Sequence, residues 1–370
     1  MALAAGVHAD VVVLGSGPAA CSLALNLAPF CHVLMVDKGD GEGASVGESL
    51  PAAAGRLFRD MGLLEAFLQQ NHAPCHASRG AWGGARMWEQ HAMGNLDGHG
   101  WHLDRRLFDA WLRQVAQSRG AGALTHTRLV SVRSLAGEMP WHLELQRGDQ
   151  RLTLSARFVV DASGRSSAFA RQLGYKRKAR DKLVCGWLFG RDGCAGGISE
   201  LHAEAQGWWY TSPLPNGRRL LSFYTDADLD AAASAHHPER LLTRVQHVPE
   251  LSRTLAAYGF SATGSVGFCA AHGAALEQAT GAGWLAVGDA ALSFDPLSAQ
   301  GLFNALYTGL AGAEAIHARL AGDGAAAGRY QAELDRIEAA YSAHLRGWYE
   351  EERRWPDQAF WQRRQGISQV

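Results

Sequence analysis

A glycine-rich stretch near the N-terminus has the residue types that cradle a pyrophosphate. Gly15-Ser16-Gly17-Pro18-Ala19-Ala20 follows an apolar, β-branched run at 10–14, which predicts a buried strand. In this GxGxxA pattern, Gly15 permits a tight turn and Gly17 lets phosphates approach the backbone. Ala20 lets the following helix pack closely on the strand. The stretch therefore predicts a dinucleotide site.

The residues around this loop predict a βαβ unit. The helix begins at Pro18 and includes Ala19, so its N-terminus would offer free N–H groups and a positive dipole end to the phosphates. A second apolar run at 32–36 ends at Asp37, where an acid accepts hydrogen bonds from a ribose hydroxyl. Lys38 beside it is a further candidate contact. This unit by itself does not separate NAD from FAD.

Two later stretches separate them. The first, Val159-Val160-Asp161-Ala162-Ser163-Gly164-Arg165-Ser166-Ser167, makes Asp161 a candidate contact. The second begins at Gly288-Asp289-Ala290 and continues through Pro296. Together with the first motif they resemble the superfamily of class A flavin monooxygenases and flavin-dependent halogenases, over residues 10 to about 315. The resemblance implies FAD.

The second of these stretches suits a flavin on physical grounds as well. Asp289 follows a buried strand and can hold the ribityl chain or a ribose. Backbone from Pro296 to Gly301 can cross the isoalloxazine ring. The helix that starts near Gly301 and Leu302 would point its N-terminus at the pyrimidine side, where the reduced ring carries negative charge.

Two more candidate contacts come from the resemblance. Arg105, within Leu103–Asp109, resembles the arginine that such proteins place near FAD, and Arg106 is an equal alternative by chemistry. Glu48 and Ser49, within Gly47-Glu48-Ser49, resemble a segment of the halogenase branch that lies close to the flavin. The alternative for Ser49 is a helix N-cap ahead of Pro51.

Patterns along the chain predict an α/β protein. The expected fold is a Rossmann-like FAD-binding domain of the glutathione-reductase and hydroxybenzoate-hydroxylase type, interleaved with a β-rich substrate domain and followed by a C-terminal helical segment. Helices are expected at 49–70 and 104–118 and strands at 124–160 and 183–225, with a turn at 215–217. The expected FAD-binding domain is 1–75 plus 100–180 plus 270–325, the substrate domain is 76–99 plus 181–269, and the helical segment is 326–370.

Halogenation is disfavoured at three places. Tryptophan halogenases carry a lysine that relays hypohalous acid, a glutamate after the late motif and a W-x-W-x-I-P signature. Ser78 and Arg79 stand where that lysine is expected, and an arginine stays charged and cannot replace its amine. Ser298 stands in place of the glutamate, and residues 207–213 replace the signature.

The stretches 207–219 and 224–228 resemble the LodB-like flavoproteins, which are encoded beside quinoprotein oxidases. The resemblance implies a monooxygenase that hydroxylates a tryptophan of a precursor quinoprotein oxidase during cysteine tryptophylquinone biogenesis. It would use FAD and O2, with NAD(P)H or a separate reductase as a transient donor, because no second GxGxxG is visible. The alternatives are a small-molecule aromatic hydroxylase or other flavin oxidoreductase, and an FAD-containing maturation chaperone.

An indole substrate would need an aromatic wall and polar groups beside the flavin. The candidate wall is Trp82, Trp208, Trp209 and Tyr210, and Trp209 is also a candidate catalytic residue. The other catalytic candidates are His76, Arg79 and His272, each of which has an ordinary structural reading as well.

Composition sets outer limits on partners and location. The formal net charge is -1, which favours neither nucleic acid nor an anionic membrane. No apolar run is long enough to span a bilayer, and the N-terminus lacks a secretory pattern. The six cysteines form no CxxC pair, which predicts reduced thiols, a cytoplasmic location and no metal site.

Overall fold

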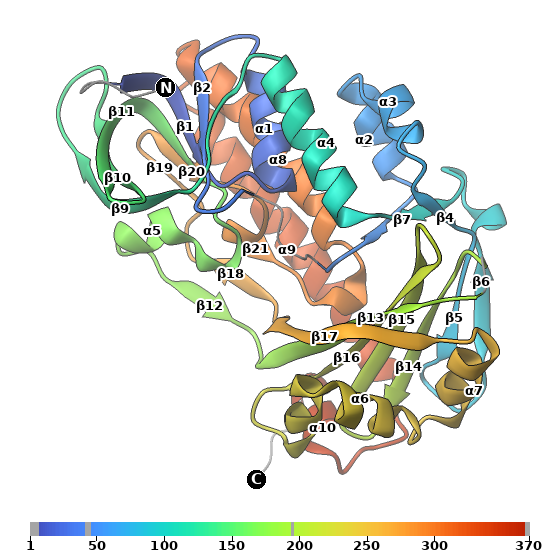
Figure 1. The fold of residues 1–370 in the computed structure, drawn as a ribbon. Helices are drawn as coiled ribbons and strands as arrows, with labels where there is room; N and C mark the ends of the chain where they lie inside the picture. The colour runs from blue at the N-terminus through green and yellow to red at the C-terminus, as the bar shows by residue number, and fades with distance from the viewer. Residues whose placement is uncertain (1–6, 41–45, 194–195, 367–370) are drawn as a thin grey trace.

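The computed structural model describes residues 7–40, 46–193 and 196–366. Figure 1 shows two sheet-centred halves with long C-terminal helices behind them. The N-terminal half carries the glycine-rich loop, and the lower half is formed by antiparallel strands. This is the mixed α/β architecture that the sequence predicts.

The first sheet has a parallel core with β1 at its centre. The order is β19-β20-β11-β1-β2-β8, and β9 and β10 extend β11 as antiparallel strands. Its strands are β1 (Val7–Leu14), β2 (Val33–Val36), β8 (Gly122–Leu124), β9 (Thr127–Ser134), β10 (Trp141–Arg147), β11 (Gln150–Asp161), β19 (Thr280–Gly281) and β20 (Trp284–Ala286). Because β1, β2, β11 and β20 run parallel, the loops that follow them meet at one edge of the sheet.

Two helices pack closely against each other over this sheet. They are α1 (Pro18–Leu27) and α8 (Gly301–Leu320). A Cβ on Gly309 would lie 2.5 Å from the carbonyl oxygen of Ala19, so only glycine allows this approach. The hydroxyl of Ser22 donates to the carbonyl of Leu306 at 2.6 Å. The approach brings the N-termini of both helices to the same region.

The second sheet forms the lower half of the molecule. Its order is β17-β13-β16-β15-β14-β5-β6, and all its pairs are antiparallel except β14 with β5. The strands are β5 (Ala77–Ala81), β6 (Trp88–His91), β13 (Leu183–Arg191), β14 (Ile198–Glu204), β15 (Gly207–Leu214), β16 (Arg218–Asp226) and β17 (Ser261–Ala270). Helices α6 (Pro238–Val245) and α7 (Pro249–Ala257) cover one face, where Trp209, Leu221 and Phe223 are buried with Leu241 and Leu251.

Two small sheets connect the halves. One has the order β3-β7-β4, from β3 (Ser49–Leu50), β4 (Ala73–Cys75) and β7 (Gly100–His102). The other has the order β12-β18-β21, from β12 (Arg177–Ala179), β18 (Ala274–Leu276) and β21 (Leu292–Ser293).

The helix predicted over 49–70 is wrong in its extent. The chain forms β3 and then two short helices, α2 (Ala54–Asp60) and α3 (Leu64–Leu68). Gly62 has φ +67°, and this left-handed conformation interrupts the helix between them. Ser49 lies in β3, so it is not a helix N-cap.

Other local predictions are confirmed. Helix α4 covers Arg105–Ser118, and the side chain of its N-cap, Asp104, accepts a hydrogen bond from Leu107 N at 3.2 Å. The predicted turn joins β15 to β16, and Asn216 and Gly217 both have positive φ, as a tight hairpin requires. Among the described helices, none has the length and apolar character needed to cross a membrane.

The C-terminal helices α9 (Ala326–Glu351) and α10 (Ala359–Arg364) tie the two halves together. In α9, Tyr330 donates to the carbonyl of Ala286 in β20 of the first sheet at 2.9 Å, and Tyr349 donates to the Asp295 carboxylate after β21 at 2.7 Å. The indole of Trp361 donates to the carbonyl of Glu204 at 3.0 Å in the second sheet. The ion pair of Arg364 with Asp226, at 2.7 Å, adds a buried anchor.

Candidate active site

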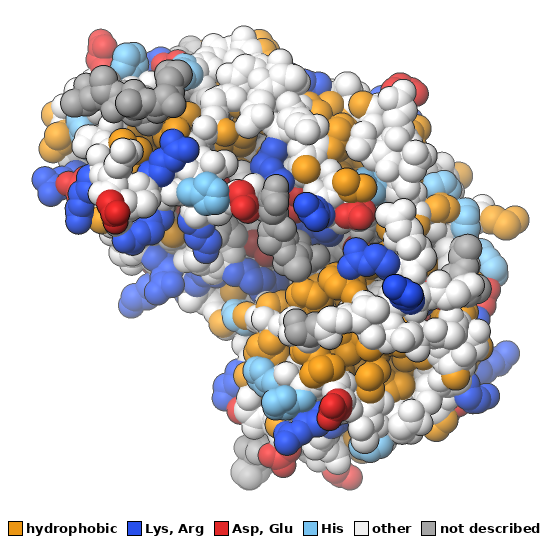
Figure 2. Space-filling model, in the orientation of Figure 1, with side chains coloured by type: hydrophobic (Ala, Val, Ile, Leu, Met, Phe, Trp, Pro, Cys, Tyr) orange, Lys and Arg blue, Asp and Glu red, His pale blue; other side chains and the backbone are white. Residues whose placement is uncertain are grey.

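A pocket lies between the first and second sheets. Its walls come from both, and Figure 2 shows a hollow between the upper and lower halves, with hydrophobic side chains gathered below it. Most of the predicted cofactor contacts line this pocket: Gly17, Pro18, Ala19, Glu48, Ser49, Arg105, Asp289, Pro296, Gly301 and Leu302. Chain segments separated by nearly 300 positions therefore meet at one cavity.

The glycine-rich loop leaves room for a ligand at the N-terminus of α1. Gly15 has φ +127°, and a Cβ there would lie 2.3 Å from the carbonyl oxygen of Ala162. Gly17 has φ −75° and no described atom within 4 Å of an added Cβ. No side chain caps the helix, so its first N–H groups are available to phosphate oxygens. This end of the pocket fits a pyrophosphate.

Asp37 is held beside the same loop without lining the pocket. Its carboxylate accepts hydrogen bonds from Ser16 Oγ at 2.6 Å and from Gly39 N at 2.8 Å. Lys38 is exposed and also lies outside the pocket lining. For both residues, contact with a bound dinucleotide stays a prediction.

Three of the predicted residues lie behind the pocket wall and support it. Gly15 and Ala20 support the turn and the packing of α1, and Ala20 is fully buried. Gly288 has φ +57°, and a Cβ there would lie 2.6 Å from the Cβ of Ala19. They stand behind the pocket wall rather than in it.

Asp161 lies outside the described pocket lining. Its carboxylate is fully buried and accepts hydrogen bonds from Ser163, Phe169 and Ala170. These bonds hold the turn after β11 and the N-terminus of α5 (Ala168–Gln172). The motif is present, and its aspartate accepts hydrogen bonds from nearby backbone N–H groups; contact of Asp161 with a bound dinucleotide stays a prediction.

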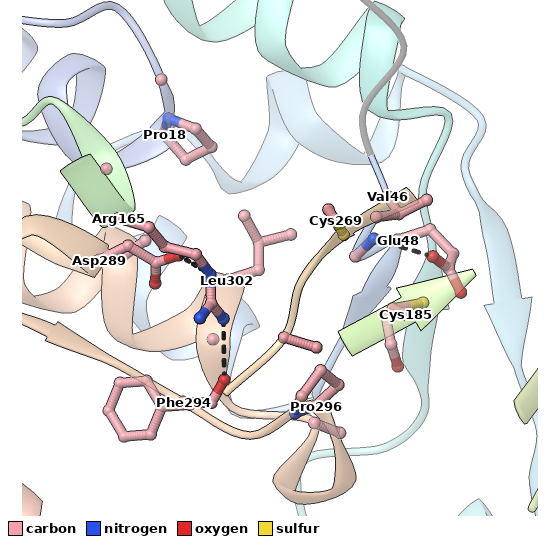
Figure 3. A pocket seen from close by; sticks show the side chains of 18 of the residues that line it. Pro18, Val46, Glu48, Arg165, Cys185, Cys269, Asp289, Phe294, Pro296 and Leu302 are labelled. Atoms are coloured by element: carbon pink, nitrogen blue, oxygen red, sulfur yellow. Dashed lines mark hydrogen bonds and ion pairs between the residues drawn. The ribbon is translucent and has the colours of Figure 1, made fainter. Parts of the chain in front are cut away.

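Arg165, in the same motif, was missed as a site residue. It lines the pocket, its Nε lies 3.4 Å from an Asp289 carboxylate oxygen, and its Nη2 donates to the carbonyl of Phe294 at 3.1 Å. Figure 3 shows Arg165 between these two partners. Burial raises the pKa of Asp289, and the charge of Arg165 opposes that rise. Its signal in the sequence was the arginine directly after Ser163-Gly164.

The N-terminus of α8 forms the next part of the wall. Pro296, Ala299, Gly301 and Leu302 line the pocket, and no side chain caps the helix. Ala299 has φ +50°, which turns the backbone into the helix. Backbone and small side chains dominate here, as the approach of a planar ring requires.

Arg105, not Arg106, lines the pocket. Its Nη1 donates to the carbonyls of Val46 and Gly47, both at 2.9 Å, while Asp109 accepts from the rest of its guanidinium. Arg106 is exposed and outside the lining. Arg105 therefore holds in place the chain segment that carries Glu48.

Glu48 presents a buried acid to the pocket. It accepts hydrogen bonds from Ser212 Oγ at 2.7 Å and from Gly47 N at 3.1 Å. Burial raises the pKa of this carboxyl above its ordinary value, and the hydrogen bond from Ser212 partly offsets the rise.

The opposite wall comes from the second sheet. Trp208 and Tyr224 are stacked with ring centroids 3.8 Å apart, and both line the pocket with Tyr210. The hydroxyl of Tyr210 is buried and has no hydrogen-bond partner among the described residues. Cys185 and Cys269 complete this wall, and neither was singled out from the sequence.

None of the four predicted catalytic side chains lines the pocket. Arg79 pairs with Glu200 at 2.9 Å, and Trp209 is fully buried with its indole donating to Glu204 at 3.1 Å. His76 is exposed, and His272 is half-buried and accepts a hydrogen bond from Arg165 through its carbonyl. These four side chains lie outside the described pocket lining, and their catalytic roles stay predictions.

Some of the predicted aromatic side chains face the pocket and others face the core, because side chains alternate along a strand. Successive side chains of a strand point to opposite faces, so on β15 Trp208 and Tyr210 face the pocket while Trp209 faces the core under α6 and α7. Trp82 is also in the interior, where its indole donates to the carbonyl of Trp348 at 2.7 Å.

Comparisons with known proteins identify the family and the fold. The model of the family described as tryptophan halogenase matches residues 86–369. The putative FAD-dependent oxidoreductase LodB of Marinomonas mediterranea is 27% identical over 97% of both chains. The chain shares its fold with the myxobacterial chondrochloren halogenase CndH, at TM-score 0.88 and 22% identity, covering 97% of this chain and 86% of that one.

A further solved structure is the peptidyl tryptophan dihydroxylase QhpG, which is essential for tryptophylquinone cofactor biogenesis. It is 25% identical with a TM-score of 0.74, over 97% of this chain and 79% of that one. The site geometry and these similarities lead to one conclusion: the chain belongs to the tryptophan halogenase family and is an FAD-dependent oxidoreductase.

Proposed function

We propose that this protein is an FAD-dependent monooxygenase that hydroxylates a tryptophan of a precursor protein, as a step in forming a tryptophylquinone cofactor of a partner oxidase. The observation that carries the proposal is the far wall of the pocket. It offers Trp208 and Tyr224 as a flat aromatic surface, and the described lining residues include no lysine.

The absence of a lysine from that lining argues against halogenation. The hydroxyl groups of Ser78 and Ser199 share a hydrogen bond of 2.9 Å, and Arg79 forms an ion pair with Glu200. Neither position therefore supplies an amine to the pocket. The only cationic side chains in the described lining are Arg105 and Arg165, and both stay charged. The similarity to QhpG favours hydroxylation of a protein-bound tryptophan instead.

In this mechanism the protein holds the cofactor and excludes water. Gly17 and the N-terminus of α1 would bind the pyrophosphate, Asp289 with Arg165 the ribityl side, and the N-terminus of α8 the ring. Bound FAD would supply the two-electron reduction of O2. An electron-rich indole would rest against the aromatic wall, and Glu48 and Tyr210 would hold a proton near the reacting atoms.

The test is mass spectrometry of a precursor quinoprotein coexpressed with and without this chain. We expect a specific tryptophan to gain oxygen only when the chain is present, and isotopically labelled O2 to supply that oxygen. The matched control is Gly17→Ala, which should keep the fold but weaken FAD binding.

Other outcomes assign another function. Halogen added in the presence of bromide would make the protein a halogenase. A stable complex with the precursor, FAD bound and no mass change, would favour the maturation chaperone. No complex and no mass change would favour a small-molecule flavin oxidoreductase.

A further inference from the structure

Two cysteines far apart in sequence face each other on the wall of the pocket. Cys185 lies on β13 and Cys269 on β17, and these antiparallel neighbours pair the two residues directly. Both side chains line the pocket, as Figure 3 shows, on the side opposite Arg165 and Asp289. Cys185 is buried and Cys269 is half-buried, and both are free thiols.

The geometry is close to that of a disulfide without being one. Directly opposed residues on antiparallel strands have Cβ atoms about 4.5–5.5 Å apart, whereas a disulfide needs about 3.5–4.5 Å. A bond between these sulfurs would therefore need only a small movement of the two strands. Thiols opposed in this way can form and break a disulfide by exchange with a small thiol.

The two thiols are chemically unequal. The hydrogen bond from Cys185 lowers the pKa of Cys269 to about 7, and the positive charge of Arg165 contributes in the same direction. Burial raises the pKa of Cys185 well above its ordinary value. One sulfur is thus suited to act as the thiolate and the other to remain its protonated partner, a division that redox-active pairs use.

We propose that Cys185 and Cys269 form a redox-active pair that exchanges two electrons with the flavin. As the S–S bond forms, the two thiols lose two electrons and two protons. Bound FAD in its oxidised form would be the acceptor of both electrons and one proton, and the second proton would go to solvent. A small dithiol then restores the pair by thiol–disulfide exchange and leaves as its own disulfide. The pair would give thiol reductants a route to the flavin, whatever the substrate.

The first test uses the apoprotein, so that its result does not depend on flavin activity. After mild oxidation with glutathione disulfide, we expect differential alkylation and mass spectrometry to find Cys185 linked to Cys269. The control is Cys75→Ala, because Cys75 is also half-buried but does not line the pocket, and it should leave the linkage intact.

The second test uses the holoenzyme under anaerobic conditions. Starting from the oxidised pair, a dithionite titration of the wild type should take two electrons per flavin more than that of Cys185→Ala, because the disulfide is a two-electron couple. Reduction of the flavin by dithiothreitol should be at least about tenfold slower in Cys185→Ala and Cys269→Ala than in Cys75→Ala.

Two results would overturn the proposal. One is that both thiols remain alkylatable after oxidation. The other is a disulfide that forms while the titration and the dithiothreitol rate match those of the variants. Neither readout involves the substrate, so failure here leaves the hydroxylation test undecided, and the converse also holds. Bound FAD in each variant, measured by absorbance, confirms that it has folded.

Discussion

The two walls of the pocket are built from different kinds of residue. The wall of the first sheet is rich in backbone, glycine and small side chains, such as Gly17, Ala19 and Gly301, beside the pair of Arg165 and Asp289. The wall of the second sheet is made of large side chains that pack on one another, such as Trp208, Tyr210 and Tyr224. The first wall leaves open space for a ligand, and the second wall offers aromatic side chains for the ligand to contact.

This difference has a chemical reason. A pyrophosphate and a flavin ring have the same shape in every protein that binds them, so the backbone must approach them in one way. The other wall meets the reaction partner, which differs among members of a fold family. Substitutions on the first wall should therefore affect cofactor binding, and substitutions on the second should affect stability and substrate choice.

The largest expected effects are on the first wall, where two glycines separate folding from binding. Gly15→Ala would place a Cβ 2.3 Å from Ala162 O at a left-handed φ, so we expect a lower melting temperature and no bound FAD. Gly17→Ala has open space around the new methyl group, so the apoprotein should melt as the wild type does. It should bind FAD about 5- to 150-fold more weakly, because a methyl group in the space that a ligand occupies costs about 1–3 kcal/mol.

Differential scanning fluorimetry of the apoproteins and FAD titrations would check this pair. If Gly17→Ala binds FAD as tightly as the wild type, the pyrophosphate does not lie at the N-terminus of α1.

On the second wall, adjacent tryptophans should have different effects. Trp209→Phe removes the indole that donates to the buried Glu204, so we expect a loss of about 1–3 kcal/mol in unfolding free energy and an unchanged KM for a tryptophan-containing precursor. Trp208→Phe keeps a ring against Tyr224 but reshapes the pocket, so KM should change by about threefold or more.

Urea denaturation and steady-state kinetics would separate the two variants. Equal effects of both substitutions on KM would contradict the assignment of Trp209 to the core.

A smaller effect is expected where the two walls join, at the sheet β3-β7-β4. Burial lowers the pKa of His102 to about 3 and that of His72 to about 4. The unfolded chain binds a proton at each histidine near pH 6.5, whereas the folded chain does not until the lower pKa is reached. These histidines therefore do not lower the free energy of unfolding above pH 6.5, and they lower it progressively as the pH drops toward 4.

Each histidine should reduce the free energy of unfolding by about 1.4 kcal/mol per pH unit within that window. Urea midpoints at pH 7.5 and 5.5 would measure the decrease, and His102→Gln should remove the part that His102 contributes. The Asp295 carboxyl, whose pKa burial raises to about 6, has the opposite dependence on pH, so the comparison of variant with wild type isolates His102. A pH dependence that is the same in both proteins would show that His102 titrates normally.

Local reasoning identified residues of the pocket wall where backbone conformation and spacing define the structure. The glycine-rich loop, Asp289, Pro296 and the start of α8 could be predicted because each needs a particular φ, a small side chain or a helix N-terminus. It does not reveal which competing partners a side chain has. Asp161 has the expected position, but nearby N–H groups use its carboxylate.

The sequence by itself determined the βαβ unit, the FAD motifs and the hairpin at 215–217, because these depend on residues close together in the chain. Only the tertiary structure decided which face of β15 meets the pocket. Alternation divides the side chains of a strand between two faces, but only the elements packed on each face show which one lines the pocket. It also brought Cys185 opposite Cys269 across 84 positions, because the pairing of β13 with β17 depends on sheet order, which no local pattern encodes.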